Sequence, residues 1–197
     1  MTNTADELTE QTVASRQLFN GRLLGLRIDT VRLPEGMEVT REIVEHPGAA
    51  AVVPLTDDGQ VLLVRQWRHP IGAPSLEIPA GTLDGSESPE ACAERELCEE
   101  IGFFPGSLHR LGAVYVSPGY SDEIIHLYVA SKLQPAKRQP DLDENLQTVR
   151  MTLEDAVAAC ADGRLSDAKT ITALLLTWQR QRYPAVDRSE HDARAPA

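Results

Sequence analysis

Residues 81–103 read GTLDGSESPEACAERELCEEIGF and carry the most informative pattern in the chain. Ser88 is a preferred helix N-cap, Pro89 suits the first helical position, and Gly102 is a typical C-terminal stop. Between these signals, three apolar residues recur at four-residue steps: Ala93, Leu97 and Ile101. The stretch therefore predicts a loop that leads into an amphipathic helix packed on a core.

The same helix carries carboxylates on one face, because residues three and four apart are neighbours on a helix. These carboxylates belong to Glu96, Glu99 and Glu100. Like charges so placed cost roughly 0.2–0.5 kcal/mol per pair unless a cation neutralises them. Mg²⁺ typically takes one or two carboxylates plus substrate phosphate oxygens. A solvated acidic face is the alternative, but Glu87 adds a further carboxylate, and Gly81 lets the backbone approach a ligand closely.

Strand signals on both sides of this segment predict a mixed sheet. The expected strands are Ala49–Leu55, Gln60–Arg68, Leu76–Pro79, Leu108–Val116, Ile124–Ala130 and Leu146–Met151. We expect the first two to form a buried hairpin, with Gly59 in its turn. A helix capped by Thr152 should end near Gly163, and a last helix should pack its apolar stripe on the core: Ile171, Leu174, Leu175 and Trp178. Strands mixed with two or three helices predict an α/β sandwich.

The N-terminal region reads as a separate unit. The first dozen residues are polar and look frayed, whereas alternation over Arg22–Thr30 and Val39–Val44 predicts a small antiparallel β-ribbon with a turn at 34–36. Two strands alone are marginal in water, so we expect the ribbon to pack on the main domain or on a second subunit. The chain is therefore divided into a ribbon, a main domain and a disordered tail: residues 1–46, 47–185 and 186–197.

Composition narrows the classes of partner. The 197 residues carry a formal net charge of −11, and an acidic surface disfavours nucleic acid. Asp6 and Glu7 precede any apolar run, which argues against a signal peptide, and the apolar stretches are too short to span a bilayer. Three scattered cysteines do not suggest a disulfide framework. We expect a cytoplasmic protein without nucleic-acid or membrane partners.

The spacing of Gly81, Glu87, Arg95-Glu96, Glu99-Glu100 and Gly102 resembles the Nudix box at every fixed position. The resemblance extends through most of residues 49–180. It implies a Nudix-type α/β/α sandwich with a mixed sheet.

Nudix enzymes use Mg²⁺ or Mn²⁺ to hydrolyse nucleoside diphosphates linked to another group. Carried over by position, the metal ligands would be Glu96, Glu100 and the backbone carbonyl of Ala80. The catalytic residues Arg95 and Glu99 would lie beside them, with Arg95 and Glu87 holding the loop and the helix together.

Two further stretches are similar to the ADP-ribose pyrophosphatase branch of this family. One is the proline sixteen residues beyond Gly102, in SPGYSDE at 117–123, and the other is RQWR at 65–68 followed by LEIPAG at 76–81. The resemblance implies hydrolysis of ADP-ribose to AMP and ribose 5-phosphate. The candidate substrate-binding residues are Arg65, Arg68, Glu77, Pro118 and Gly119.

The general base is open at this point. In the branch it often comes from a loop glutamate before the last strand, and Glu144 matches one acidic position there, as a base or as a metal ligand. Relatives carry a second glutamate two residues earlier, where this chain has Leu142. The other candidates are Asp141, Asp143 and Glu123.

Other readings also stay open. The substrate could be GDP-mannose, a dinucleotide or a flavin nucleotide, and a Nudix-like sensor could bind ADP-ribose without cleaving it, although this chain keeps every box carboxylate. Family resemblance and the ribbon together predict a homodimer built through residues 15–46.

Overall fold

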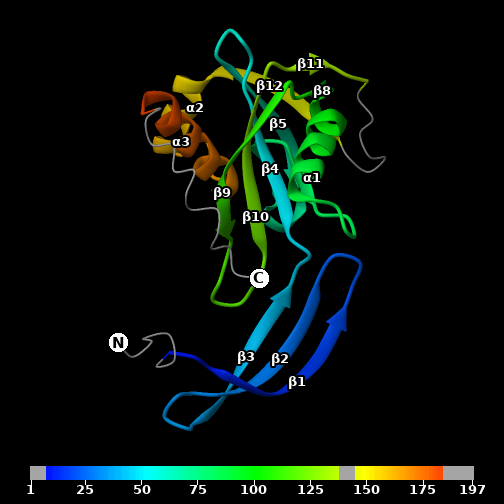
Figure 1. Ribbon diagram of the computed structural model, residues 1–197, viewed down its shortest axis with the longest axis vertical. Helices are drawn as coiled ribbons and strands as arrows, with labels where there is room; N and C mark the ends of the chain where they lie inside the picture. The colour runs from blue at the N-terminus through cyan, green and yellow to red at the C-terminus, as the bar shows by residue number, and fades with distance from the viewer. Residues whose placement is uncertain (1–7, 138–144, 184–197) are drawn as a thin grey trace.

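The computed structural model describes residues 8–137 and 145–183. The N-terminal ribbon projects from one end of the main body (Figure 1). It is a three-stranded antiparallel sheet of β1 (Gln11–Asn20), β2 (Gly25–Arg32) and β3 (Glu38–Glu45). The expected turn at Gly36 forms, with φ at 93°.

The predicted antiparallel ribbon is confirmed, but β1 adds a third strand that the sequence did not reveal, and it begins at Gln11, within the stretch expected to be frayed. All ten residues of β1 are exposed. The strand therefore has no one-sided burial for hydrophobic alternation to reveal, and it is held by its backbone pairing with β2. The start predicted for the next strand was also too early, since the Gly21 amide donates to the Leu24 carbonyl in a turn.

The main body contains a mixed four-stranded sheet in the order β7-β4-β10-β9. Its strands are β4 (Ala49–Pro54), β7 (Ala80–Thr82), β9 (Ser107–Tyr115) and β10 (Ile124–Ser131). β4 and β10 are parallel, and the other pairs are antiparallel. The predicted mixed sheet is confirmed.

A second sheet has the order β12-β5-β6. It consists of β5 (Gln60–Arg68), β6 (Ala73–Glu77) and β12 (Gln147–Thr152), with the short 3₁₀ turn η1 (His69–Ile71) between β5 and β6. Two short strands, β8 (Phe103–Phe104) and β11 (Gln134–Pro135), pair separately.

The predicted hairpin of β4 and β5 is wrong beyond its turn. Gly59 does take a positive φ of 78°, and one bridge joins Leu55 to Val61. The strands then diverge into different sheets, where each has two other neighbours. Both runs are apolar on both faces, which is typical of central strands, so their periodicity does not reveal which strands flank them.

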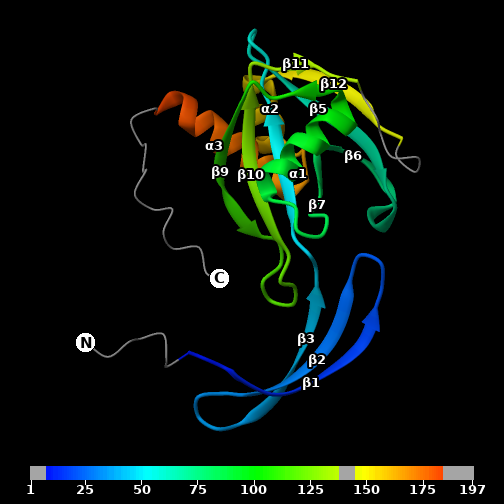
Figure 2. The ribbon, with the colours of Figure 1, turned by 45° about the vertical axis from the view of Figure 1, so that its right-hand side comes forward.

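Helices cover both faces of the sheets (Figure 2). They are α1 (Pro89–Glu96), continued by the π-helical turn η2 (Leu97–Ile101), α2 (Leu153–Ala161) and α3 (Ala168–Arg182). The predicted caps are confirmed: Ser88 accepts from Ala91 N–H, and Thr152 accepts from Asp155 N–H. Within the described ranges, no helix is long and apolar enough to cross a membrane.

Two apolar clusters form the core, and strand alternation divides β4 and β5 between them. Ala51, Val53 and Leu63 pack in the cluster that includes buried residues of α2 and α3. Val52 and Leu62 pack with Leu97 in the cluster that includes α1. This arrangement is the predicted α/β sandwich, and it places α1 and η2 against β7.

Candidate active site

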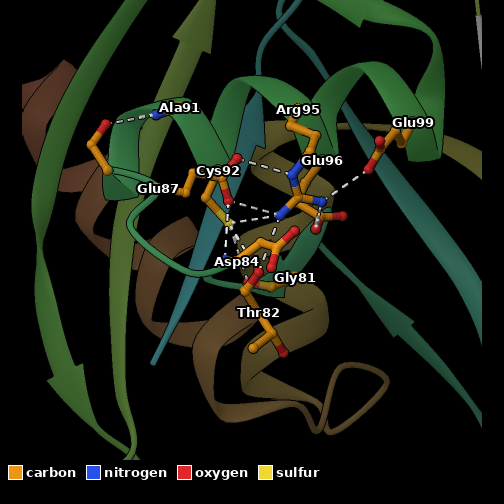
Figure 3. Close-up of polar contacts among 10 residues, drawn as sticks. Gly81, Thr82, Asp84, Glu87, Ala91, Cys92, Arg95, Glu96 and Glu99 are labelled. Atoms are coloured by element: carbon orange, nitrogen blue, oxygen red, sulfur yellow. Dashed lines mark hydrogen bonds and ion pairs between the residues drawn. The ribbon is translucent and has the colours of Figure 1, made fainter. Parts of the chain in front are cut away.

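Arg95 on α1 organises the loop and helix predicted to bind metal (Figure 3). Its Nε and Nη2 each donate to one oxygen of Glu87 at 3.0 Å. Its Nη1 donates to Glu96 at 2.6 Å and to Glu99 at 3.0 Å, and Nη2 reaches the carbonyl of Thr82 at 3.1 Å. One guanidinium thus ties three carboxylates to the β7 backbone.

The contacts between Arg95 and Glu87 shift the pKa of both groups. Hydrogen bonds to Glu87 raise the pKa of Arg95 further above its usual value. In return, the Arg95 guanidinium holds the pKa of Glu87 below its usual value. Both groups therefore stay charged at neutral pH, and a bidentate charged pair is directional as well as strong.

Gly81 gives the Glu96 carboxylate its place. A Cβ built on Gly81 would lie 1.7 Å from Oε1 of Glu96 and 2.1 Å from its Cδ. Any side chain at position 81 must therefore displace this carboxylate. The requirement for glycine comes from close approach, as the sequence suggested, since Gly81 has no positive φ.

Glu100 lies deeper than its neighbours, with only 1% of its surface exposed. Its Oε2 accepts a hydrogen bond from the Ala80 amide at 3.1 Å. Glu99 and Glu100 lie in the π-helical turn η2, a type of irregularity that is frequent at functional sites. The structure therefore brings Ala80, Glu96 and Glu100 together, as the family resemblance implied.

A cleft of about 920 Å³ opens over this segment. Five of the predicted site residues line it: Arg68, Ala80, Arg95, Glu96 and Glu99. Arg22 and Leu23, from the turn between β1 and β2, line it as well. The ribbon therefore reaches the candidate site within its own chain.

Arg68 and Glu77 form a bidentate pair at the edge of this cleft, with N–O distances of 2.8 and 2.7 Å. Glu77 also accepts from Lys169 at the start of α3. Burial of Glu77 opposes its ionisation, but the hydrogen bonds from Arg68 and the charge of Lys169 outweigh it and lower its pKa to about 2. Glu77 is buried, so Arg68 is the member of the pair that lines the cleft.

Among the predicted residues that the structure describes, Glu77 and Glu100 are buried and do not line the cleft, and four others lie elsewhere. The side chains of Arg65 and Arg68 lie on opposite sides of β5. Arg65 donates a hydrogen bond to Gln147 on β12 at 3.5 Å. Pro118 and Gly119 line a separate hollow of about 600 Å³ between the ribbon and the β9–β10 loop. Glu123, on that loop, lies 3.9 Å from His46. Glu144 lies outside the described residues, as do Asp141, Leu142 and Asp143.

The donor set suits a hard divalent cation. Among the residues that the structure describes, no three His, Cys, Asp or Glu side chains form a ready group for a metal. Mg²⁺ needs only one or two carboxylates when substrate phosphates complete its shell. Glu96 and Glu100, held against Gly81 and Ala80, provide two carboxylates in this position. The site therefore fits a cation that binds together with a phosphate-bearing substrate.

Sequence reasoning missed several cleft and network residues. Strand alternation could have revealed Gln66, since it lies on the same side of β5 as Arg68 and lines the cleft. No local signal marks Arg22 and Leu23 of the ribbon, nor Lys169, which is 92 residues from Glu77.

Comparison with known proteins identifies the family. Residues 45–174 match the NUDIX domain. ADP-ribose pyrophosphatase of Bacillus subtilis (strain 168) is 43% identical over 169 residues, which are 85% of this chain and 91% of that protein. Methanol dehydrogenase activator of Bacillus methanolicus is 40% identical over 167 residues, 84% of this chain and 90% of that protein.

A solved structure shows the same fold. The crystal structure of an ADP compounds hydrolase superposes with a TM-score of 0.80 at 24% identity, covering 90% of this chain and 96% of that one. These matches confirm the resemblance to the Nudix box and to the ADP-ribose pyrophosphatase branch. The chain belongs to the Nudix family of hydrolases.

Proposed function

We propose that this protein hydrolyses the diphosphate linkage of ADP-ribose, with Mg²⁺ or Mn²⁺, and releases AMP and ribose 5-phosphate. The observation that carries the proposal is the cleft in which Arg68 and the box carboxylates line one space. A relative named ADP-ribose pyrophosphatase is 43% identical over most of this chain, which favours this substrate.

Each residue of the cleft has a distinct task in this proposal. Glu96, Glu100 and the Ala80 carbonyl hold the cation. The bound cation neutralises diphosphate charge and lowers the pKa of the attacking water. Arg68 binds the diphosphate through its guanidinium, whose planar fork suits phosphate oxygens. Arg95 holds the carboxylates in position through its hydrogen bonds, and Glu99 lies beside them at the cleft surface.

The general base is proposed to be Glu144, which would also be able to bind the cation, with Glu123 as the alternative. A base must come within about 2.6–3.2 Å of the water that it deprotonates, directly or through one water. Glu123 lies on the loop that contacts the ribbon, near His46. Turnover of Glu144→Gln and Glu123→Gln would separate the two, since only loss of the base should cost about 10²–10⁴-fold.

Arg65, Pro118 and Gly119 are proposed to bind substrate outside the cation site. Pro118 and Gly119 line the hollow beside the ribbon, where Tyr115 and Tyr120 are also exposed. Aromatic faces of this kind can stack on a nucleobase.

A homodimer built through the ribbon is part of the proposal, with residues 1–46 as the dimerisation unit. β1 is an edge strand whose apolar side chains are exposed, including Leu18 at 45% and Phe19 at 59%. Exposed edges and apolar patches favour association with another chain. Light scattering at micromolar concentration should give twice 21.6 kDa; a monomer would contradict the dimer.

GDP-mannose is the second candidate substrate. A GDP-mannose pyrophosphatase of Yersinia enterocolitica is 38% identical over 144 residues, which are 68% of this chain. The two candidates share the diphosphate and differ in the base and the sugar, so the metal and arginine roles would be the same for either.

Product analysis tests the proposal. Purified protein is incubated with Mg²⁺ and a panel of nucleoside diphosphate sugars that includes ADP-ribose and GDP-mannose. We expect AMP and ribose 5-phosphate from ADP-ribose as the preferred substrate, and loss of on the order of 10³-fold in turnover for Glu100→Gln. Faster turnover of GDP-mannose would make GDP-mannose, and not ADP-ribose, the preferred substrate. Binding of ADP-ribose without release of products would indicate a sensor domain that does not catalyse hydrolysis.

A further inference from the structure

The first turn of α3 contacts two consecutive buried residues, Glu77 and Ile78, just before Ala80 of the cleft. Lys169 donates to Oε2 of Glu77, and the Ile78 amide donates to the hydroxyl of Thr170 at 3.0 Å. Thr170 is fully buried, so this second contact is shielded from water. The turn therefore holds both a side chain and the backbone of the segment that leads to Ala80.

The three charged groups form a row in which the carboxylate of Glu77 lies between the two cations and is the most buried member. The side-chain exposed fractions are 11% for Lys169, 3% for Glu77 and 40% for Arg68. Glu77 shares Oε2 between both cations, and its Oε1 accepts from Arg68 alone. Arg68 is thus the only member of the row that lines the cleft.

Asp167 completes the group from the helix side. Its Oδ1 lies 3.1 Å from the Lys169 ammonium, and its Oδ2 accepts from the Thr170 amide at 3.0 Å as the cap of α3. The four charges sum to zero. Without Lys169 the remaining three sum to −1, and the buried carboxylate of Glu77 would keep only Arg68 as a cationic partner.

A buried carboxylate that loses one of two cations binds the other more closely, because its desolvation is then less well compensated. The guanidinium of Arg68 would be drawn toward Glu77, and the added negative charge would repel an anion in the cleft. Lys169 therefore affects the cleft although it does not line it.

We propose that Lys169 is a positioning residue for substrate: it supports Glu77 from the side of α3, so that Arg68 presents its guanidinium to a diphosphate. Asp167 and Thr170 hold the helix turn that carries it. The inference rests on the proposed function, in which Arg68 binds the diphosphate of the substrate.

The first test compares binding and turnover in variants at this position. Lys169→Met removes the ammonium and keeps most of the side-chain volume. We expect the Kd for ADP-ribose, measured by calorimetry without divalent cation, and the KM with Mg²⁺ to rise about tenfold, as for loss of one charge-assisted contact. The kcat should change much less, and Lys169→Arg should restore binding.

A matched control removes the same charge from the same helix. Arg182 lies thirteen residues further along α3, roughly 20 Å at the usual helical rise, and contacts the ring of Trp178. Arg182→Ala should leave the Kd and the KM unchanged. An equal loss in both variants would mean that net charge alone is responsible and would overturn the positioning role.

A double-mutant cycle keeps the test decisive if Lys169→Met folds poorly. Glu77→Gln/Lys169→Met removes both charges, so no buried carboxylate is left uncompensated. If Lys169 acts through Glu77, the double variant should bind ADP-ribose as Glu77→Gln does. Additive losses would overturn the inference.

Arg68→Ala separates this inference from the proposed function. Weaker binding in Arg68→Ala with wild-type binding in Lys169→Met would overturn only the role of Lys169. Unchanged binding in both would overturn the assignment of Arg68 as well. Wild-type protein that neither binds nor hydrolyses ADP-ribose would count against the proposed function itself.

Discussion

The loop and helix of residues 81–103 and the N-terminal ribbon are both ordered, but by different forces. In the loop and helix, Arg95 binds three carboxylates and a carbonyl, while Leu97 is fully buried in the core. In the ribbon, all ten residues of β1 are exposed, and backbone pairing holds the strand. The site is thus held by side-chain contacts, whereas the side chains of β1 are left exposed.

The largest expected difference is in stability. Leu97→Ala should lower the free energy of unfolding by about 2–5 kcal/mol, because it empties a packed position in the core. Leu18→Ala, at a residue that is 45% exposed, should change it by less than about 0.5 kcal/mol in the isolated subunit. Urea unfolding at low protein concentration measures both, and equal losses would remove the contrast between the two regions.

The buried network of Glu77 makes the main body sensitive to acid. Its pKa is lowered from 4.5 to about 2, so its stabilising charge is present above pH 4.5 and is lost as the pH falls toward 2. At neutral pH this contributes on the order of 3 kcal/mol. The difference in unfolding free energy between wild type and Glu77→Gln should shrink over this range, and a difference that is independent of pH would contradict the assignment.

Gly81→Ala should separate activity from stability within the site. The new Cβ overlaps only the end of the Glu96 side chain, which can move, so the fold should be retained. The carboxylate would shift by about 1 Å or more, and a misplacement of that size can cost about 10²-fold in turnover. Circular dichroism and steady-state kinetics test this, and a fully active variant would show that Glu96 does not need its present place.

The smallest effect belongs to the surface of the ribbon. Arg32 and Glu38 pair at 2.7 Å across β2 and β3, with each side chain 46% exposed. Glu38→Ala should cost about 0–1 kcal/mol, and 1 M salt should remove most of that difference, because exposed ion pairs are screened. A larger loss that persists in salt would mean that the ribbon is stabilised by side chains more than its exposure indicates.

Local sequence patterns predicted the structure correctly where the forces that determine it act within one helix or strand. The cap at Ser88 and the apolar face through Leu97 follow from residues within one helix, and the structure confirms both. The β4–β5 hairpin failed because two strands that are apolar on both faces can pair with any central neighbour. β1 was missed because a strand without a buried face has no alternation to detect.

The amino-acid pattern was enough to identify the family and the loop that leads into the capped helix. These features depend on residues within about one turn of each other, or on a spacing that few sequences share. Three contacts depend on the folding of the whole chain: Arg68 rather than Arg65 lines the cleft, the ribbon contributes Arg22 to it, and Lys169 donates to Glu77. Each of these contacts joins distant segments through the packing of strands and helices, and no periodicity within one segment encodes which other segment will lie beside it.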